Sequence, residues 1–316
     1  DDNYIVLSTD SDAELGGLAF QDTDLVEYDR DADTATLFLD SLSAGLSKKV
    51  DALHVLENGN LILSVDGGTT FAGLSVASED LFEYDPVAGT AAMYIEADVH
   101  FESKKNIISA HILDNGNVVL STDGNATLGG LDFSDKDLVE YNRFTGEASI
   151  YFDGDATTLS QRISALHILN DGRLVLTADG DTTLGGLSFR QDQLIEYDPV
   201  ADSAILFFDG ETLFTETSEK IRALHIGTGS GSSDTSIGTQ HVKLVVGYST
   251  NLASEDSDRK THFESSYYRV TEIDDGSSQS SFDTAASDND VVFVSGTIID
   301  STLGNKLTGS PTSVVN

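Results

Sequence analysis

The chain has 316 residues, and its 54 Asp and Glu against 17 Lys and Arg give a formal net charge of -37. This charge disfavours duplex nucleic acid and an anionic membrane as partners, because both attract cationic surfaces. The chain has no cysteine, which excludes disulfides and thiolate chemistry, and no apolar run approaches the ~20 residues of a membrane span. High salt screens self-repulsion, so a halophilic or marine source is one interpretation and an ordinary acidic extracellular protein is the other. We expect an extracellular or cell-surface location.

A block of sequence recurs along the chain with a period of 56 to 58 residues. Four histidines mark it, each within an apolar run and spaced 57, 56 and 58 residues apart: His54, His111, His167 and His225. A second marker is DLVEYD at 24–29, which returns as DLFEYD at 80–85, DLVEYN at 137–142 and QLIEYD at 193–198. Because self-similarity at a fixed period indicates a repeat architecture, the repeat argues against a single catalytic centre.

Each repeat contains four short runs rich in β-branched, aromatic and aliphatic residues. In the fourth copy they are 165–169, 174–177, 194–197 and 204–208. Asn58-Gly59, Asn115-Gly116 and Asp171-Gly172 join the first two runs of successive copies and are strong hairpin signals. No stretch shows a sustained helical period, so we expect little helix.

Four consecutive antiparallel strands per repeat resemble the β-propeller superfamily, in which each repeat forms one blade. The resemblance is one of architecture, since the period exceeds those of WD and kelch repeats. It implies an all-β, five-bladed propeller of four-stranded antiparallel blades over residues 1–296. The expected repeats are 1–50, 51–106, 107–162, 163–222 and 223–289, followed by a closing strand at 290–296. Residues 297–316 are a Ser/Thr/Gly-rich tail or linker.

The ring closure is expected at the C-terminus. The chain begins inside a repeat, so the first blade lacks its innermost strand, as expected of a processed or excised piece. The run 290–294 (DVVFV) lies about one period after His225. We therefore expect it to pair beside residues 4–8 and to remove an open sheet edge. Blade 5 would take its second strand from 242–249 and its third from 267–270.

The four histidines have two interpretations. One is a ring of imidazoles that binds a metal on the propeller axis. The other, which the repetition favours, is a buried structural network with partners that recur on the next two strands. The expected partners are the hydroxyls of Ser8, Ser64, Ser121 and Thr177 and the carboxylates of Glu27, Glu83, Glu140 and Glu196.

An acidic, glycine-rich loop follows the second strand of each repeat. Its candidate calcium ligands are Asp10, Asp12, Asp66, Asp123, Asn125, Asp179 and Asp181. Oxygen ligands at alternate positions suit Ca²⁺, whereas Asp-Gly and Asn also simply form turns. Calcium is the only cofactor that we expect.

The few cations gather just before the innermost strands. The candidate ligand-binding residues there are Lys49, Lys105, Arg162, Lys220 and Arg222, with Lys48 and Lys104 beside them. Blade 5 adds Arg259, His262 and Arg269. One interpretation is recognition of an acidic polysaccharide. The other, which we favour, is ion pairing with the acidic loops.

The leading function is a non-catalytic binding or scaffold propeller that recognises an acidic glycan or a protein partner. The first alternative is a subunit of an extracellular filament or coat, a homo-polymer that assembles by strand exchange. The second is a carbohydrate-active enzyme, which needs isolated acids on innermost strands. Asp51 is the only acid there before the closing segment, so no catalytic residue is assigned.

Overall fold

The computed structural model describes residues 4–215 and 219–227, together with the backbone of four later strands. The chain divides into two compact units, one of residues 1–56 and 60–231 and one of residues 57–59 and 232–316. We call the first the propeller unit. Among the described residues no helix is long and apolar enough to cross a membrane.

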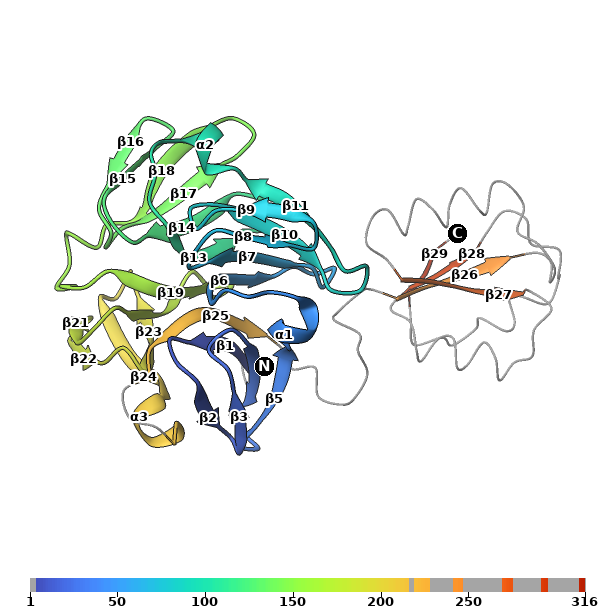
Figure 1. The fold of residues 1–316 in the computed structure, drawn as a ribbon, viewed down its shortest axis with the longest axis horizontal. Helices are drawn as coiled ribbons and strands as arrows, with labels where there is room; N and C mark the ends of the chain where they lie inside the picture. The colour runs from blue at the N-terminus through green and yellow to red at the C-terminus, as the bar shows by residue number, and fades with distance from the viewer. Residues whose placement is uncertain are drawn as a thin grey trace. The chain divides into compact units, whose positions relative to one another are not determined.

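The described part of the propeller unit forms four antiparallel blades of four strands each (Figure 1). From the innermost strand outward, blade 1 contains β25 (Ile221–Gly227), β1 (Tyr4–Thr9), β4 (Leu25–Asp29) and β5 (Thr34–Leu39). Blade 2 contains β6 (Val50–Val55), β7 (Leu61–Val65), β10 (Leu81–Asp85) and β11 (Thr90–Ile95). Blade 3 contains β13 (Ile107–Ile112), β14 (Val118–Thr122), β17 (Leu138–Asn142) and β18 (Glu147–Phe152). Blade 4 contains β19 (Ile163–Ile168), β20 (Leu174–Ala178), β23 (Gln193–Asp198) and β24 (Ser203–Asp209).

The predicted five-bladed ring is wrong in its count and its closure. β25 pairs with β1 in the register Tyr4 to Gly227, Ile5 to Ile226 and Val6 to His225. The strand that was expected to begin a fifth blade therefore completes the first one. The innermost strands β6, β13, β19 and β25 pack in sequence, and β25 also packs against β6. The ring thus closes after four blades.

The second and third strands assigned to blade 5 and the closing strand form a different sheet in the second unit. β26 (His241–Val246) pairs in parallel with β27 (Arg269–Asp274) on one edge and with β28 (Val291–Val294) on the other. β28 in turn pairs in parallel with β29 (Ser313–Val315). Both edges of β28 are occupied, so the segment predicted to close the ring is not a blade strand. The rest of the predicted tail lies outside the described residues.

The loop after each second strand folds into a small hairpin that sequence analysis treated as a loop. The hairpins pair β2 (Ala13–Leu15) with β3 (Leu18–Phe20), β8 (Thr69–Phe71) with β9 (Leu74–Val76), β15 (Ala126–Leu128) with β16 (Leu131–Phe133), and β21 (Thr182–Leu184) with β22 (Leu187–Phe189). Gly129 at one hairpin turn has φ +57°, and a Cβ there would lie 2.4 Å from the Gly146 oxygen. Glycine is required at that position because a side chain would collide with the outer turn.

The outermost strands lead into short connectors. In the described residues the helical ones are α1 (Ser41–Ala44), α2 (Ala97–His100) and α3 (Gly210–Leu213), and α2 continues into β12 (Phe101–Ser103), which pairs with β15. In blades 1 to 3 the first aspartate of the repeated DLVEYD motif fixes the connector that follows, and in blade 4 Gln193 stands at that place and donates to Asp209 at 2.8 Å. Asp80 is buried, accepts hydrogen bonds from the Ala97 and Ala77 amides at 2.9 and 2.8 Å, and so holds the connector against the hairpin.

The apolar core lies mainly between neighbouring blades. One cluster, for example, joins Ile5 and Val26 of blade 1 to Val175 and Leu194 of blade 4, all 0% exposed, and another joins Ile62 of blade 2 to Leu120 of blade 3. Because each blade buries its faces against its neighbours, removing one innermost strand exposes two such clusters.

Two arginines clamp alternate blade interfaces, and sequence analysis did not identify them. Arg143, in the turn after β17, lies 3.9 Å from the Tyr94 ring centroid in blade 2 and donates to the Tyr94 carbonyl at 3.3 Å. Arg30, in the turn after β4, repeats the contact with Phe207 of blade 4, at 4.1 Å from the ring centroid and 2.7 Å from the carbonyl. The matching positions in blades 2 and 4 hold Pro86 and Pro199. The clamps therefore alternate around the ring.

Replacing Arg143 with alanine is expected to lower the free energy of unfolding by about 1–3 kcal/mol, because the variant loses a cation–π contact and a hydrogen bond to a carbonyl. Arg173→Ala is the matched control, since Arg173 makes partly exposed ion pairs with Asp171 and Glu196, which are worth about 0–1 kcal/mol. Urea unfolding followed by circular dichroism measures both. Equal losses in the two variants would contradict the clamp.

Candidate functional site

The acidic loops and the connectors between blades emerge on one side of the ring, which we call the connector face. Strand order requires this, because the turn after every second strand and the link after every fourth strand leave a blade at the same end. A backbone hydrogen bond ties each acidic loop to the segment before an innermost strand. The four bonds are Asp10 to Lys220, Asp66 to Lys49, Asp123 to Asn106 and Asp179 to Arg162, at 2.9–3.0 Å.

Of the five candidate ligand-binding cations near the starts of innermost strands, all but Lys105 are ion-paired on this face within the described part of the chain. Lys49 lies 3.1 Å from Asp22 and donates to the Asp10 carbonyl at 2.5 Å. Arg162 donates to the Asp123 carbonyl at 2.9 Å and, with Lys220, contacts the Asp179 carboxylate. Apart from the Arg162–Asp179 pair, which lies within blade 4, these contacts cross from one blade to the next. The ion-pair interpretation therefore accounts for three of the predicted residues.

Arg222 forms a buried pair with Asp51 across the closure of the ring. The guanidinium of Arg222, on β25, donates to Asp51 at a β-bulge of β6 at 2.6 Å and also contacts Asp10. Asp51 is 3% exposed. Burial raises its pKa to about 6, and the opposing effect of Arg222 only partly offsets this. The one acid on an innermost strand is thus a structural partner of the closing strand.

Lys48 and Lys105 differ from the other cations before the innermost strands in the partners of their ammonium groups. The Lys105 side chain lies against the acidic loop of its own blade, and a Cβ on Gly124 would be 3.3 Å from it. Lys48 lies against Gly67 in the same way. Within the described residues neither ammonium has a carboxylate partner. Gln161 lies against Gly180 at the matching place in blade 4, so a neutral side chain is compatible with the position.

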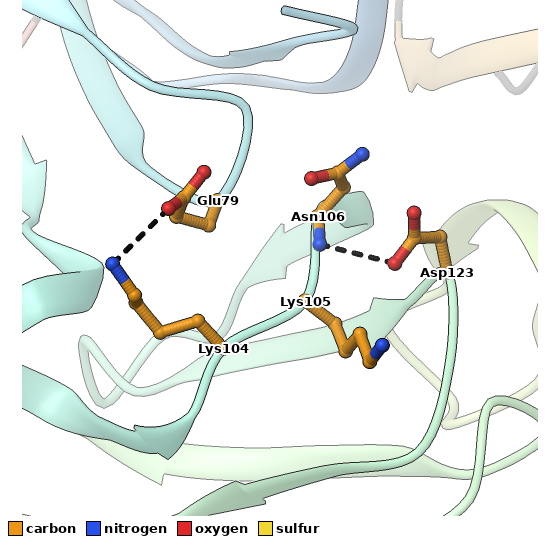
Figure 2. Close-up of a pocket in the computed structure, with 5 residues that line it drawn as sticks. All are labelled: Glu79, Lys104, Lys105, Asn106 and Asp123. Carbon is orange, nitrogen blue, oxygen red and sulfur yellow. Dashed lines mark hydrogen bonds and ion pairs between the residues drawn. The ribbon is translucent and has the colours of Figure 1, made fainter.

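A polar cavity of about 310 Å³ lies on the connector face between blades 2 and 3. Its lining residues are Glu79, Lys104, Lys105, Asn106 and Asp123. Figure 2 shows the Lys104 ammonium directed toward Glu79 and the Lys105 side chain extending away from that pair. The cavity coincides with a departure from the repeat, because Asn106 stands where the other blade starts have Lys49, Arg162 and Lys220.

The four predicted histidines form a ring at the centre of the propeller unit. Adjacent imidazole centroids are 4.6–5.3 Å apart and the rings are nearly perpendicular. Each Nδ1 accepts a backbone N–H from the next innermost strand: Ile112 to His54, Ile168 to His111, Ile226 to His167 and Val55 to His225, at 3.1–3.3 Å. The proton of each neutral imidazole therefore lies on Nε2.

Burial keeps the imidazoles neutral. It lowers the pKa of His54 to about 4 and that of His225 to about 3. Burial, reinforced by the other ring histidines, also lowers the pKa of His111 and His167 well below the usual value. The hydrogen bonds between blades favour the structural interpretation. The metal interpretation needs nitrogen lone pairs directed at one point, and every Nδ1 is already used.

The predicted network of His, hydroxyl and Glu is wrong in its partners. Ser64 donates to the Ile107 carbonyl of the next blade at 2.7 Å, and Ser8 and Ser121 repeat this bond. Thr177 instead points to the carbonyls of residues 190 and 191. The strand register places Ile62 between His54 and Glu83, which separates imidazole from carboxylate. Glu83 accepts from Asn60 at 2.6 Å instead.

The candidate calcium ligands are already partly engaged. Asp10 and Asp179 contact cations, and Asp12 accepts the Asp22 amide at 3.1 Å. Asp66 and Asp123 accept the amides of residues 49 and 106. Over the described residues, no group of three or more His, Asp or Glu side chains is arranged to hold a metal ion. Calcium in these loops, including Asn125 and Asp181, stays a prediction.

The remaining predicted residues are in the second unit. Arg259 and His262 lie outside the described residues, and Arg269 is placed only as the first residue of β27. Sequence analysis also missed the cavity. The sequence signal for the cavity is Asn106, which occupies the position before an innermost strand where the other repeats have a lysine or an arginine.

Comparisons with known proteins identify no family. No family model matches the chain, and no curated protein matches it. Among solved structures it is similar to the extracellular domain of a putative one-component system, BT4673, from B. thetaiotaomicron, with 14% identity and a TM-score of 0.26 over 67% of this chain and 23% of that one. YCF48 bound to a D1 peptide matches with 6% identity and a TM-score of 0.32 over 68% and 62% of the two chains. The extracellular domain of the putative hybrid two-component system BT4673 matches with 14% identity and a TM-score of 0.28 over 69% and 27%. The chain spans less than two thirds of each of these structures, and the assignment as a β-propeller rests on its own strand pairing.

Proposed function

We propose that this chain is a non-catalytic binding or scaffold propeller, secreted or on a cell surface, whose connector face recognises an acidic glycan. One observation carries the proposal. Lys48 and Lys105 lie on that face without a carboxylate partner among the described residues, although acids outnumber cations about three to one. An unpaired ammonium on an acidic protein is available to a carboxylate or sulfate from outside.

The alternatives find less support. Strand exchange through the first blade needs an open edge on β1, and both edges of that strand are paired, with β25 and with β4. Glycoside hydrolysis needs two carboxylates free to act on the sugar. Asp51 is buried against Arg222, and the repeated aspartates fix connectors. A binding role requires neither an open edge nor a free carboxylate pair.

A panel of acidic polysaccharides tests this function. The double variant Lys48→Gln/Lys105→Gln takes the residue that blade 4 has at the same place and is expected to fold. It should bind an acidic polysaccharide at least tenfold more weakly than the parent chain. The control Lys49→Gln/Lys136→Gln removes the same charge from lysines paired with Asp22 and Asp155 and should retain most of the binding. Absence of any acidic ligand, or equal losses in both variants, would refute the proposal.

A further inference from the structure

The cavity between blades 2 and 3 differs from a simple cationic patch. Lys104 lies 3.3 Å from Glu79 and also contacts Asp98, so its charge is compensated. Asp123 accepts the Asn106 amide at 3.1 Å. The lining therefore contains two ammonium groups and two carboxylates, and its formal charge is balanced. Such a lining suits a ligand that both donates and accepts hydrogen bonds.

Two donors in the cavity have no partner among the described residues. The Lys105 ammonium is one. The other is the Asn106 side-chain amide, whose Oδ1 accepts from Ser78 at 2.8 Å while its Nδ2 makes no such bond. Both belong to the same connector and precede β13. Lys105 supplies the charge that attracts an anionic group, and Asn106 supplies a directed N–H for a second oxygen of the same ligand.

The two carboxylates in the cavity can accept hydrogen bonds from the same ligand. Glu79 and Asp123 lie on either side of Asn106 in Figure 2, where the Lys105 side chain extends in a different direction from the Asn106 amide. Each carboxylate accepts more than one hydrogen bond. Hydroxyl groups on a ligand would donate to them. The volume of about 310 Å³ is at the low end of the range for small-molecule sites, about 300–1,000 Å³. It therefore suits one sugar residue rather than an oligosaccharide.

We propose that this cavity holds a single sugar residue that carries a carboxylate, a hexuronate, with the carboxylate at Lys105, a hydroxyl oxygen at the Asn106 amide and ring hydroxyls at Glu79 and Asp123. The inference rests on the proposed function and deepens it by naming the recognised residue of the glycan. At the start of blade 2 the position of Asn106 is held by Lys49, whose ammonium already contacts Asp22 and the Asp10 carbonyl.

The test titrates the full chain with D-glucuronate and D-galacturonate, and with D-glucose as the neutral comparison, followed by NMR or calorimetry. Lys105→Gln should weaken uronate binding at least tenfold. Asn106→Lys, which copies the cation of blades 2 and 1, should weaken it similarly by filling the cavity. Lys136→Gln is the matched control, because it removes the same charge from a lysine that pairs with Asp155 and does not line the cavity, and uronate binding should be unchanged.

The outcomes separate this inference from the function on which it rests. If an acidic polysaccharide binds through Lys48 and Lys105 but neither uronate binds, or Lys105→Gln and Asn106→Lys bind uronate like the parent, the cavity assignment is overturned and the function stands. If D-glucose binds as tightly as the uronates, the carboxylate assignment is overturned. If no acidic polysaccharide binds the chain, the proposed function itself fails.

Discussion

A chain that ends at Gly231 is expected to fold into the complete four-bladed ring, whereas one that ends at Ser218 is expected to unfold or aggregate. The shorter chain lacks β25 and leaves the inner edge of β1 without a partner, which favours edge-to-edge association. It also loses Ile221, Leu224 and Ile226, which are 0–5% exposed. Each such side chain contributes roughly 1.5–3 kcal/mol, against a total stability of about 5–15 kcal/mol.

Circular dichroism melting and size-exclusion chromatography measure this difference. The chain that ends at Gly231 should be monomeric and melt cooperatively, because the propeller unit retains every described blade strand. Sequence analysis alone predicts the opposite, since it places the closing strand at 290–294. An unfolded product on truncation at Gly231, or a folded one at Ser218, would contradict closure by β25.

The second large effect is a pH dependence of the histidine ring. Each ring imidazole has a pKa below that of the unfolded chain, about 6.5, so the unfolded state takes up protons first as the pH falls. The stability that neutral histidines contribute is therefore present above pH 6.5 and is lost as the pH falls toward 4 for His54 and toward 3 for His225. The loss amounts to roughly 1.4 kcal/mol per pH unit for each histidine.

Asp51 acts in the opposite direction. Its pKa is raised to about 6 in the fold, chiefly by burial, so its contribution is present at low pH and is lost as the pH rises through about 6. Protonation of surface carboxylates also relieves the repulsion of the acidic chain as the pH falls. The total curve therefore combines opposing effects, and one histidine must be isolated by comparison with a variant.

His167→Ala isolates one member of the ring. At pH 7.5 the variant should be about 1–3 kcal/mol less stable than the parent, because the Ile226 amide loses its acceptor. At pH 4.5 the difference should shrink or reverse. The parent is destabilised at that pH because His167 takes up a proton in the unfolded chain but resists it in the fold, and the variant has no such imidazole. Urea unfolding at several pH values measures it. A difference that is independent of pH would contradict a neutral, buried His167, and stoichiometric zinc lost in the variant would show a metal ring instead.

The strands of each repeat could be predicted from sequence, whereas the partner of the closing strand could not. Alternating apolar residues and Asn-Gly turns determine where a blade strand begins and ends, and all four expected runs of the fourth copy lie within or overlap observed strands. An apolar run, however, does not specify its neighbour. Residues 290–294 matched the period, yet residues 223–226 carry the complete innermost-strand pattern and pair with β1.

The positions of the candidate site residues were predictable, and their contacts were not. The column of cations before the innermost strands placed Lys49, Lys105 and Arg162 on one face. A long side chain has several carboxylates within reach on an acidic protein, so sequence could not separate paired Lys49 from unpaired Lys105. The inter-blade bonds of Ser64 and His54 were missed for a related reason, because a repeat pattern does not show which neighbouring blade supplies a partner.

Engineered disulfides test the four-bladed closure most directly, because the natural chain has no cysteine. Tyr4 lies opposite Gly227 in the pairing of β1 with β25, so Tyr4→Cys/Gly227→Cys should cross-link within one chain under mild oxidation, as seen by mass spectrometry. Tyr4→Cys/Val294→Cys joins the two segments that sequence analysis paired and should stay reduced. A cross-link between positions 4 and 294, with none between 4 and 227, would contradict the four-bladed ring.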